Sequence, residues 1–301
     1  MTTGGGRPGD RYPTRVPDRP ALLHRTDPVV WGPDHPGPFT AAELAAHDRD
    51  GFVTVPDLLA PDEVGVLRAE LDRLATDPAL RADERTVVER SGDRVRSVFE
   101  VHALSDAIAA LVADERLAGR ARQVLGSDVH VHQSRINYKA GFGGAGFSWH
   151  SDFETWHAED GMPAPRALSV SIALTENSAL NGSLMIIPGS HRTFVACVGR
   201  TPADHYRESL REQHIGTPDP QSLTTLADRH GIALLTGPAG SAVFFDSNCM
   251  HGSADNITPY PRSNLFVVFN SVGNALVEPF AAPAPRPPHV AARTVRPLRG
   301  S

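Results

Sequence analysis

The second half of the chain reads as a series of short strands, and no other feature of the sequence limits the fold as much. From Val129 to about residue 280, apolar and polar positions alternate over short stretches that Gly and Pro interrupt. Strands of this kind are typical of a β-sandwich or a barrel. A chain of 301 residues can also bury a substantial core. We therefore expect a mainly β fold with flanking helices.

The first half of the chain supplies the flanking helices. Thr40 and Glu43 form a capping box, which predicts a short helix that Gly51 ends. A second helix is expected to begin near Pro61, where the following acidic residues suit the helix dipole. Its apolar stripe consists of Val64, Leu67, Leu71 and Leu74. A third helix is expected from Ser105 to Leu125, and the second and third helices are predicted to be packing layers without chemistry of their own.

Other segments complete the predicted organisation. Strands are expected at Phe52–Val55 and at Val95–His102. Residues 1–38 are rich in Pro, Gly, Arg and Asp, which predicts an irregular N-terminal arm, or a tail that becomes ordered only against the body or a second subunit. Residues 39–301 are predicted to form a single domain with a charged, partly helical insertion at about 202–230.

Composition argues against several classes of protein. The net charge of −6 and the lack of a basic block do not suit a general nucleic-acid binder. No apolar run approaches the roughly 18 residues of a membrane span, and the N-terminus lacks the apolar core of a signal peptide. Cys197 and Cys249 form no C-x-x-C pair, which favours a reduced, cytoplasmic compartment without a disulfide.

Alternation also separates the two faces of individual strands. In Ala167–Leu174 one face is large and apolar, while the other is small and includes Ser169 and Ser171. This strand either packs outward and leaves room for a ligand inside, or is an ordinary sandwich strand with a wet serine face. Residues 131–139 put four polar side chains on one face: Gln133, Arg135, Asn137 and Lys139. That face is either solvated or the wall of a polar pocket.

A candidate metal centre lies in the same half of the chain. In His150-Ser151-Asp152, an extended backbone would direct the first and third side chains to the same side. A third ligand opposite them would complete a set of two histidines and one carboxylate, which suits ferrous iron and leaves three positions open. The best candidate is His251, which follows an apolar run and precedes Gly252.

An arginine follows this histidine at a suitable distance along the chain. Arg262 carries a permanent charge and forked donors, which match a ligand with a distal carboxylate. If Arg262 points towards the metal, strand alternation brings Asn264 and Phe266 to the same cavity. A His-x-Asp pair, a distant histidine and a later arginine form the pattern of the 2-oxoglutarate-dependent oxygenases.

Three other patterns are interpreted as structural. Gly141–Gly146 satisfies G-x-G-x-x-G, but a strand-like segment follows where a dinucleotide-binding fold requires a helix. His157-Ala158-Glu159 resembles the H-x-E of zinc deaminases, yet no P-C-x-x-C follows. His130-Val131-His132 lacks the later glutamate of a cupin metal site.

The segment from Phe147 to Pro163 closely resembles the signature of the ectoine hydroxylases, a branch of the phytanoyl-CoA dioxygenase-like superfamily. The similarity runs from about residue 10 to the C-terminal region. Its other specific pieces are residues 133–139, 188–191, 244–253 and 270–279. It implies a double-stranded β-helix, that is, a jelly-roll or cupin-like barrel wrapped by helices, for the single oxygenase domain. Ala164-Pro165 and Ser247-Asn248-Cys249 depart from the usual pattern without touching a proposed ligand.

The resemblance also implies roles for individual residues. The expected Fe(II) ligands are His150, Asp152 and His251. The expected 2-oxoglutarate neighbourhood consists of Lys139, Asn137, Phe147, Ser253 and Arg262, and the expected ectoine-side wall of Gln133, Trp156, Ser169, Asn264 and Phe266. Such enzymes use O2 and 2-oxoglutarate to hydroxylate ectoine to 5-hydroxyectoine, a compatible solute of osmotic stress, with release of succinate and CO2. The resemblance further implies a homodimer.

Two alternatives remain open at this point. The same machinery could act on another small amino-acid-like substrate such as proline. The chain could instead be a non-catalytic jelly-roll protein that holds structural zinc through His150, Asp152 and His251, with Cys249 as a fourth ligand. That alternative leaves Arg262 without a task.

Overall fold

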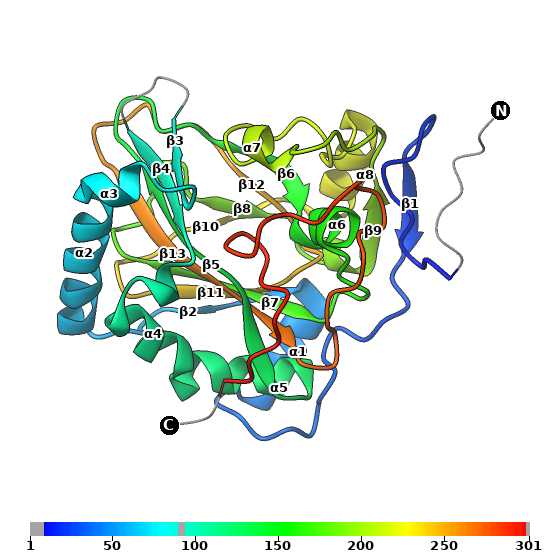
Figure 1. Cartoon of the computed structure of the whole chain (residues 1–301). Helices are drawn as coiled ribbons and strands as arrows, with labels where there is room; N and C mark the ends of the chain where they lie inside the picture. Colours follow the sequence, from blue (N-terminus) through cyan, green and yellow to red (C-terminus); the bar gives the residue numbers. More distant parts are fainter. Residues whose placement is uncertain (1–8, 90–93, 299–301) are drawn as a thin grey trace.

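The structure is a computed structural model that describes residues 9–89 and 94–298 (Figure 1). The strands are β1 (Ala21–His24), β2 (Phe52–Val55), β3 (Thr86–Val88), β4 (Val95–Phe99), β5 (Val129–Lys139), β6 (Phe147–Ser151), β7 (Ala167–Ala173), β8 (Leu184–Ile186), β9 (Thr193–Ala196), β10 (Ala233–Leu235), β11 (Ala242–Asp246), β12 (Met250–Ser253) and β13 (Arg262–Ser271). The α-helices are α1 (Ala41–Asp50), α2 (Pro61–Thr76), α3 (Pro78–Arg81), α4 (Asp106–Ala113), α5 (Arg120–Leu125), α6 (Asp152–Thr155), α7 (Tyr206–Ser209) and α8 (Pro220–His230). Short 3-10 or π turns are η1 (Val101–Ala103), η2 (Glu115–Gly119), η3 (Trp156–Asp160) and η4 (Ser190–Arg192).

Two β-sheets form the barrel, and helices cover its outside (Figure 1). The seven-stranded sheet has the order β2-β11-β7-β13-β5-β4-β3, and the four-stranded sheet has the order β10-β8-β12-β6. Neighbouring strands in both sheets are antiparallel. The predicted class, a mainly β jelly roll with flanking helices, is confirmed.

The first two predicted helices form where their local signals placed them. Thr40 and Glu43 make both halves of the capping box, with N···O distances of 3.2 and 2.7 Å. Gly51 then ends α1 with a left-handed backbone, φ 84°. Helix α2 buries the predicted stripe, Val64, Leu67, Leu71 and Leu74. The strand predicted at Phe52–Val55 is β2 and pairs with β11.

Two predicted elements were too long. The helix expected over Ser105–Leu125 is divided, because Asp114 has an extended backbone and its carboxylate caps the amide of Arg116 at 2.7 Å. The strand expected over Val95–His102 ends at Phe99, because Glu100 turns the chain with a left-handed φ of 54°. In both cases the apolar pattern of the sequence continues, but a single residue adopts a backbone conformation that interrupts the helix or the strand.

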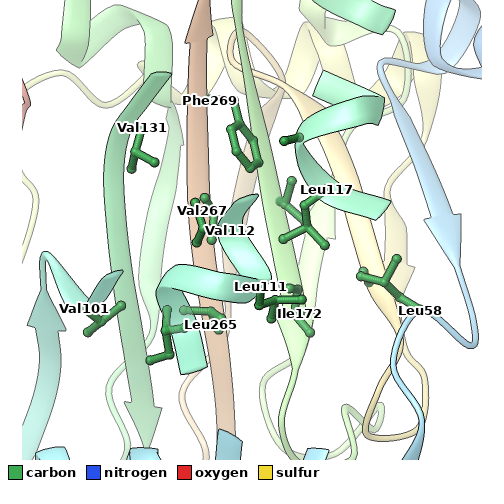
Figure 2. Close-up of a cluster of buried hydrophobic side chains, with 14 of the residues drawn as sticks. Leu58, Val101, Leu111, Val112, Leu117, Val131, Ile172, Leu265, Val267 and Phe269 are labelled. Atoms are coloured by element: carbon green, nitrogen blue, oxygen red, sulfur yellow. The ribbon is translucent and has the colours of Figure 1, made fainter. Parts of the chain in front are cut away.

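The main core lies between the seven-stranded sheet and helices α2, α4 and α5 (Figure 1). Figure 2 shows the outer face of β13 against the helical side chains, with Leu265, Val267, Phe269, Leu111, Val112 and Leu117 labelled. The large face of β7, Leu168, Val170 and Ile172, joins the same cluster. The small face of β7, including Ser169 and Ser171, is buried on the inner side of the sheet, so the wet-face interpretation is wrong.

The N-terminal segment lies against this body. Strand β1 pairs with β9, with Ala21 opposite Ala196 (Figure 1). Tyr12, Arg15 and Arg25 from the same segment are buried. Part of the predicted arm, residues 1–8, lies outside the described residues. Within the described chain, every helix is too short or too polar to span a membrane.

Candidate metal centre

Two neighbouring strands, and the helix that follows one of them, bring the three predicted metal ligands together. Strands β6 and β12 pair with His150 opposite His251, and the two ring centroids are 4.2 Å apart. Nε2 of His150 lies 3.7 Å from Asp152 Oδ1, and Nε2 of His251 lies 4.0 Å from Asp152 Oδ2. Across residues 9–89 and 94–298, these three side chains are the one group whose ligand atoms are placed to hold a metal ion, all lying within 4.8 Å of one another.

The aspartate reaches this point from a helix. Strand β6 ends at Ser151, and Asp152 is the first residue of α6, so the expectation of one extended strand through all three residues is wrong. Ser151 caps the helix, because its hydroxyl accepts from the amide of Glu154 at 3.4 Å. The strand-to-helix turn therefore fixes the angle between the imidazole of His150 and the carboxylate.

Backbone carbonyls orient both imidazoles. His150 Nδ1 lies 2.7 Å from the carbonyl oxygen of Ser148, and His251 Nδ1 lies 3.0 Å from that of Cys249. Each Nδ1 therefore carries the proton and donates, which leaves the Nε2 lone pairs free to face the centre. The third ligand is oriented by Ser169, whose hydroxyl donates to Asp152 Oδ2 at 3.1 Å.

The protonation states also suit metal ligands. Burial and the neighbouring His150 lower the pKa of His251 to about 4, which keeps this ring neutral. Burial alone would raise the pKa of Asp152, but His251 and His150 outweigh it and hold the pKa well below its usual range. The centre thus presents a neutral imidazole and a carboxylate anion in the forms that bind metal.

Two buried basic side chains lie next to each other at one end of the barrel. Arg262 and Lys139 are opposite each other in the β13–β5 pairing and are 3% and 2% exposed. Lys139 Nζ donates to Ser253 Oγ at 2.9 Å and to the carbonyl of Ala254. Arg262 Nε and Nη1 have no hydrogen-bond partner in the described structure.

Burial of these two basic groups side by side costs free energy when no anion is bound. Burial and the nearby Arg262 lower the pKa of Lys139 to about 6. Burial also lowers the pKa of Arg262 to about 10. Unpaired buried donors and like charges are expensive unless a ligand neutralises them. The pair is therefore suited to receive a carboxylate.

A cleft of about 60 Å³ opens beside the centre. Its lining includes Gln133, Asn137, Phe147, His150, Asp152 and Trp156 from the predicted site, together with Ser97, Phe99, Arg135, Thr155, Ser209, Leu210, Gln213 and Arg286. The polar face of β5 is therefore a pocket wall, and the solvated interpretation is wrong. Asn137 Oδ1 accepts from Ser97 Oγ at 2.8 Å, and the Phe147 ring packs 4.0 Å from the Arg96 guanidinium.

The other predicted residues lie in the barrel wall outside this lining. Asn264 Nδ2 donates to Ser171 Oγ at 3.0 Å, and Phe266 lies 5.2 Å from the Arg135 guanidinium. Gln133 also contacts the C-terminal segment, because its Nε2 donates to the Val290 carbonyl at 2.6 Å. Alternation along β13 correctly put Arg262, Asn264 and Phe266 on the inner face.

Two arginines of the cleft were missed. Arg135 Nη1 donates to Gln133 Oε1 at 2.5 Å, while its Nε is buried without a partner in the described structure. The alternation of β5 placed Arg135 on the polar face of this strand, but Arg135 was not predicted to be a site residue. Arg286 pairs with Asp160 through two bonds of 2.8 and 2.5 Å. It lies in an irregular C-terminal segment without periodicity, so no local signal could identify it.

The patterns interpreted as structural stay outside the centre. Gly141–Gly146 forms a turn before β6, and His157 Nε2 lies 3.0 Å from Asp10 Oδ1. His130 and His132 line a separate cavity of about 460 Å³, whose lining contains none of the three ligands. The thiol of Cys249 donates to the Gly51 carbonyl at 3.2 Å and is not part of the metal group.

Comparison with known proteins agrees with this geometry. Residues 47–264 match the phytanoyl-CoA dioxygenase (PhyH) family. The chain is 63% identical over 289 residues to the ectoine dioxygenase of Nocardia farcinica (strain IFM 10152), covering 96% of this chain and 95% of that protein.

Solved structures of the same kind superimpose closely. The crystal structure of EctD from S. alaskensis with 2-oxoglutarate and 5-hydroxyectoine has a TM-score of 0.87 at 45% identity, covering 96% of this chain and 100% of that chain. The structure of EctD from S. alaskensis with bound Fe also has a TM-score of 0.87 at 45% identity, with 97% and 98% covered. The predicted resemblance is thereby confirmed, and the chain belongs to the phytanoyl-CoA dioxygenase (PhyH) family.

Proposed function

We propose that the chain is an iron(II)- and 2-oxoglutarate-dependent dioxygenase that hydroxylates ectoine to 5-hydroxyectoine. One observation carries the proposal: a group of two histidines and one carboxylate lies beside a cleft, and the basic side chains of Arg262 and Lys139, for which the described residues show no ion pair, are buried in the same barrel. The similarity to ectoine dioxygenases over nearly the whole chain supports ectoine as the substrate.

The donor set suits ferrous iron. His150, His251 and Asp152 would hold the ion, and Ser169 would keep the carboxylate oriented. With iron bound, 2-oxoglutarate and O2 supply the oxidising power, because decarboxylation to succinate and CO2 leaves one oxygen atom for a C–H bond. The three residues are at most 9% exposed, so the protein limits access of water to the metal.

The buried cations would seat the co-substrate. Arg262 has buried donors without partners among the described residues, and its guanidinium can donate to the distal carboxylate of 2-oxoglutarate. Lys139 would add a second positive charge, with Ser253 holding its ammonium group. Asn137 and Phe147, which line the cleft, would complete this neighbourhood.

Ectoine is a cyclic amidine that bears a carboxylate, and the cleft offers a partner for each end. Trp156 lines the cleft and can pack against the delocalised cation. Arg135 has a buried donor without a partner in the described structure and can receive the carboxylate. Gln133 also lines the cleft, while Ser169, Asn264 and Phe266 would shape the wall behind it.

Two alternatives differ in what they predict. A proline hydroxylase would use the same metal and co-substrate but would leave ectoine unchanged. A structural zinc site needs a fourth protein ligand, whereas the Cys249 thiol donates to the Gly51 carbonyl. The zinc alternative also leaves the buried Arg262 donors, which have no partner in the described structure, without a function.

Product analysis tests the proposal. Purified protein is incubated with Fe(II), 2-oxoglutarate, O2 and either ectoine or proline, and the products are measured by mass spectrometry together with succinate. We expect ectoine to gain one oxygen atom, and NMR should place the hydroxyl group on ring carbon 5. Oxygenated proline with unchanged ectoine would support the first alternative, and tightly bound zinc without succinate would support the second.

The proposal extends to the organisation of the protein. Residues 39–301 are proposed to form one catalytic jelly-roll domain, with residues 1–38 as its N-terminal arm and residues 202–230 as an insertion that reaches the cleft through Gln213. A homodimer in the cytoplasm is proposed on the family resemblance. Light scattering of the purified protein tests the dimer, because a monomer mass would contradict it.

A further inference from the structure

Two buried arginines of the N-terminal segment bind the two pieces of chain that carry the metal ligands. Neither arginine belongs to the candidate centre. Arg15 binds the α6–η3 helix, which begins with Asp152, and Arg25 binds Asp246, the last residue of β11 before the turn that leads to His251. Both guanidinium groups lie on side chains that are 1% exposed.

Arg15 holds the helix at two points. Its Nε and Nη2 donate to the two carboxylate oxygens of Glu154 at 2.8 and 3.0 Å, and Nη2 also donates to Glu159 Oε1 at 3.1 Å. Thr14 adds a bond from its hydroxyl to Glu154 Oε1 at 2.6 Å. The same helix supplies the metal ligand Asp152 and the cleft residue Trp156, so Arg15 fixes the element from which both project.

Arg25 makes an equivalent contact to the other ligand segment. Its Nη1 lies 2.8 Å from both carboxylate oxygens of Asp246, and its Nη2 donates to the Pro165 carbonyl at 3.1 Å. Asp246 Oδ1 accepts in turn from the amide of Asn248 at 2.8 Å. This turn leads directly into β12, where His251 is the second residue.

The two bound segments also touch each other. The amide of Phe153 donates to the Ser247 carbonyl at 2.8 Å, and Ser151 Oγ donates to Asn248 Oδ1 at 3.0 Å. A displacement of either segment is therefore transmitted to the other. The N-terminal segment closes this network from outside, because Arg15 and Arg25 are only ten positions apart in the sequence.

Stabilisation of the fold does not by itself account for these two buried ion pairs. Buried ion pairs lose much of their attraction to desolvation, so two of them are weak means of stabilising a fold. Arg15 also adopts a left-handed backbone with φ 56°, a conformation that L-residues keep only when their surroundings impose it. A planar fork that fixes two acceptors at once is, however, well suited to setting the position of a neighbouring segment.

We propose that Arg15 and Arg25 are positioning residues that set the distance between Asp152 and His251. The proposal rests on the function proposed above and adds the N-terminal segment to the machinery that shapes the metal centre. Removal of a group that hydrogen-bonds directly to a metal ligand commonly changes metal affinity or activity by about 10- to 100-fold. Arg15 and Arg25 act one contact further out, through Glu154 and Asp246, so we expect an effect at the lower end of this range.

Conservative substitutions separate this role from a loss of folding. Arg15→Lys and Arg25→Lys keep the buried positive charge but lose the fork that binds two acceptors. Arg11→Lys is the matched control, because Arg11 is in the same segment, also forms an ion pair, to Asp27 at 2.9 Å, and is 51% exposed. All three variants have the same formal charge as the unsubstituted protein.

Two measurements test the positioning role without depending on catalytic activity. Calorimetric titration of the metal-free protein with Mn(II) should give a dissociation constant raised by roughly tenfold in the first two variants and unchanged in the control. Hydrogen exchange of the metal-free protein should become faster over residues 152–160 in Arg15→Lys and over residues 246–251 in Arg25→Lys. Exchange elsewhere in the barrel should remain that of the unsubstituted protein.

The ratio of hydroxylated ectoine to succinate gives the third measurement. A smaller folded fraction lowers both products equally and leaves this ratio unchanged, whereas a misplaced centre decarboxylates 2-oxoglutarate without hydroxylating the substrate. We expect the ratio to fall at least about twofold in both variants, as small displacements reduce productive alignment. Unchanged Mn(II) affinity and an unchanged ratio in both variants would overturn the proposal. If the unsubstituted protein leaves ectoine unchanged, the proposed function fails, and Mn(II) affinity with hydrogen exchange alone decides the positioning role.

Discussion

Arg262→Gln is a substitution for which the stability of the ligand-free protein and its affinity for the co-substrate should move in opposite directions. Burial lowers the pKa of Arg262 from its ordinary value of 12.5 to about 10. Because one pKa unit corresponds to about 1.4 kcal/mol, the unpaired guanidinium costs the ligand-free protein roughly 3 kcal/mol. Glutamine removes the charge and keeps an amide donor. We therefore expect the free energy of unfolding to stay the same or to rise by up to about 3 kcal/mol.

The same substitution should severely weaken binding of 2-oxoglutarate. Removing one partner of a buried charge pair costs about 2–5 kcal/mol, which raises the dissociation constant by roughly 30-fold to several thousand-fold. The loss should be confined to ligands with a distal carboxylate. 2-Oxobutyrate, which lacks that group, should bind the variant and the unsubstituted protein equally well.

Chemical denaturation of the metal-free proteins measures the first effect, and calorimetry in the presence of Mn(II) measures the second. Arg262→Lys is the control that retains the charge but loses the fork, and its loss of affinity should be smaller. Equal affinity of Arg262→Gln and the unsubstituted protein for 2-oxoglutarate would refute the reasoning. An equal loss for 2-oxobutyrate would refute it as well, because the effect would then not arise at the distal carboxylate.

Four further predictions concern other parts of the site. Asp152→Ala should abolish hydroxylation and Mn(II) binding while the circular dichroism spectrum stays unchanged, and retained turnover would remove Asp152 from the ligand set. Binding of 2-oxoglutarate at pH 8 should take up about one proton, because the pKa of unliganded Lys139 is lowered to about 6 and the bound dianion favours the ammonium form. Calorimetry in two buffers of different ionisation enthalpy measures this uptake, and equal heats of binding in the two buffers would contradict it. The lowered pKa of Lys139 also predicts that the stability of the ligand-free protein rises with pH between pH 6 and pH 10. In this range the folded state binds fewer protons at Lys139 than the unfolded chain does, so a higher pH favours the folded state. Trp156→Ala should raise the KM for ectoine by roughly 2- to 30-fold, as expected from a cation–π contact of about 0.5–2 kcal/mol, and an unchanged KM would show that the ring does not touch the substrate.

Local signals in the sequence were enough for much of the fold. The capping box at Thr40 and the stripe from Val64 to Leu74 depend on residues a few positions apart, so their consequences can be predicted without tertiary information. Strand alternation likewise separated the two faces of β7 and β13, although it left open whether the serine face of β7 is solvated and made the inner face of β13 depend on the direction of Arg262. The three candidate ligands were predicted from residue types and spacing, and the structure places their ligand atoms within 4.8 Å of one another.

The missed features depend on contacts between distant segments. The turn at Asp114 and the start of α6 at Asp152 each interrupt a pattern that remains favourable on either side. Arg286 enters the cleft from an irregular segment, and its position depends on Asp160, which is 126 positions away. The N-terminal segment was expected to be irregular, and no periodicity in it indicates that Arg15 and Arg25 reach the ligand segments.

The central claim is that three side chains hold one iron ion at which oxygen is transferred to ectoine. Incubation with ectoine, 2-oxoglutarate and Fe(II) under ¹⁸O2 tests it most directly, with the label measured by mass spectrometry in both products. The account predicts one labelled atom in 5-hydroxyectoine and one in succinate, in nearly equal amounts. Labelled succinate with unlabelled, unchanged ectoine would contradict it.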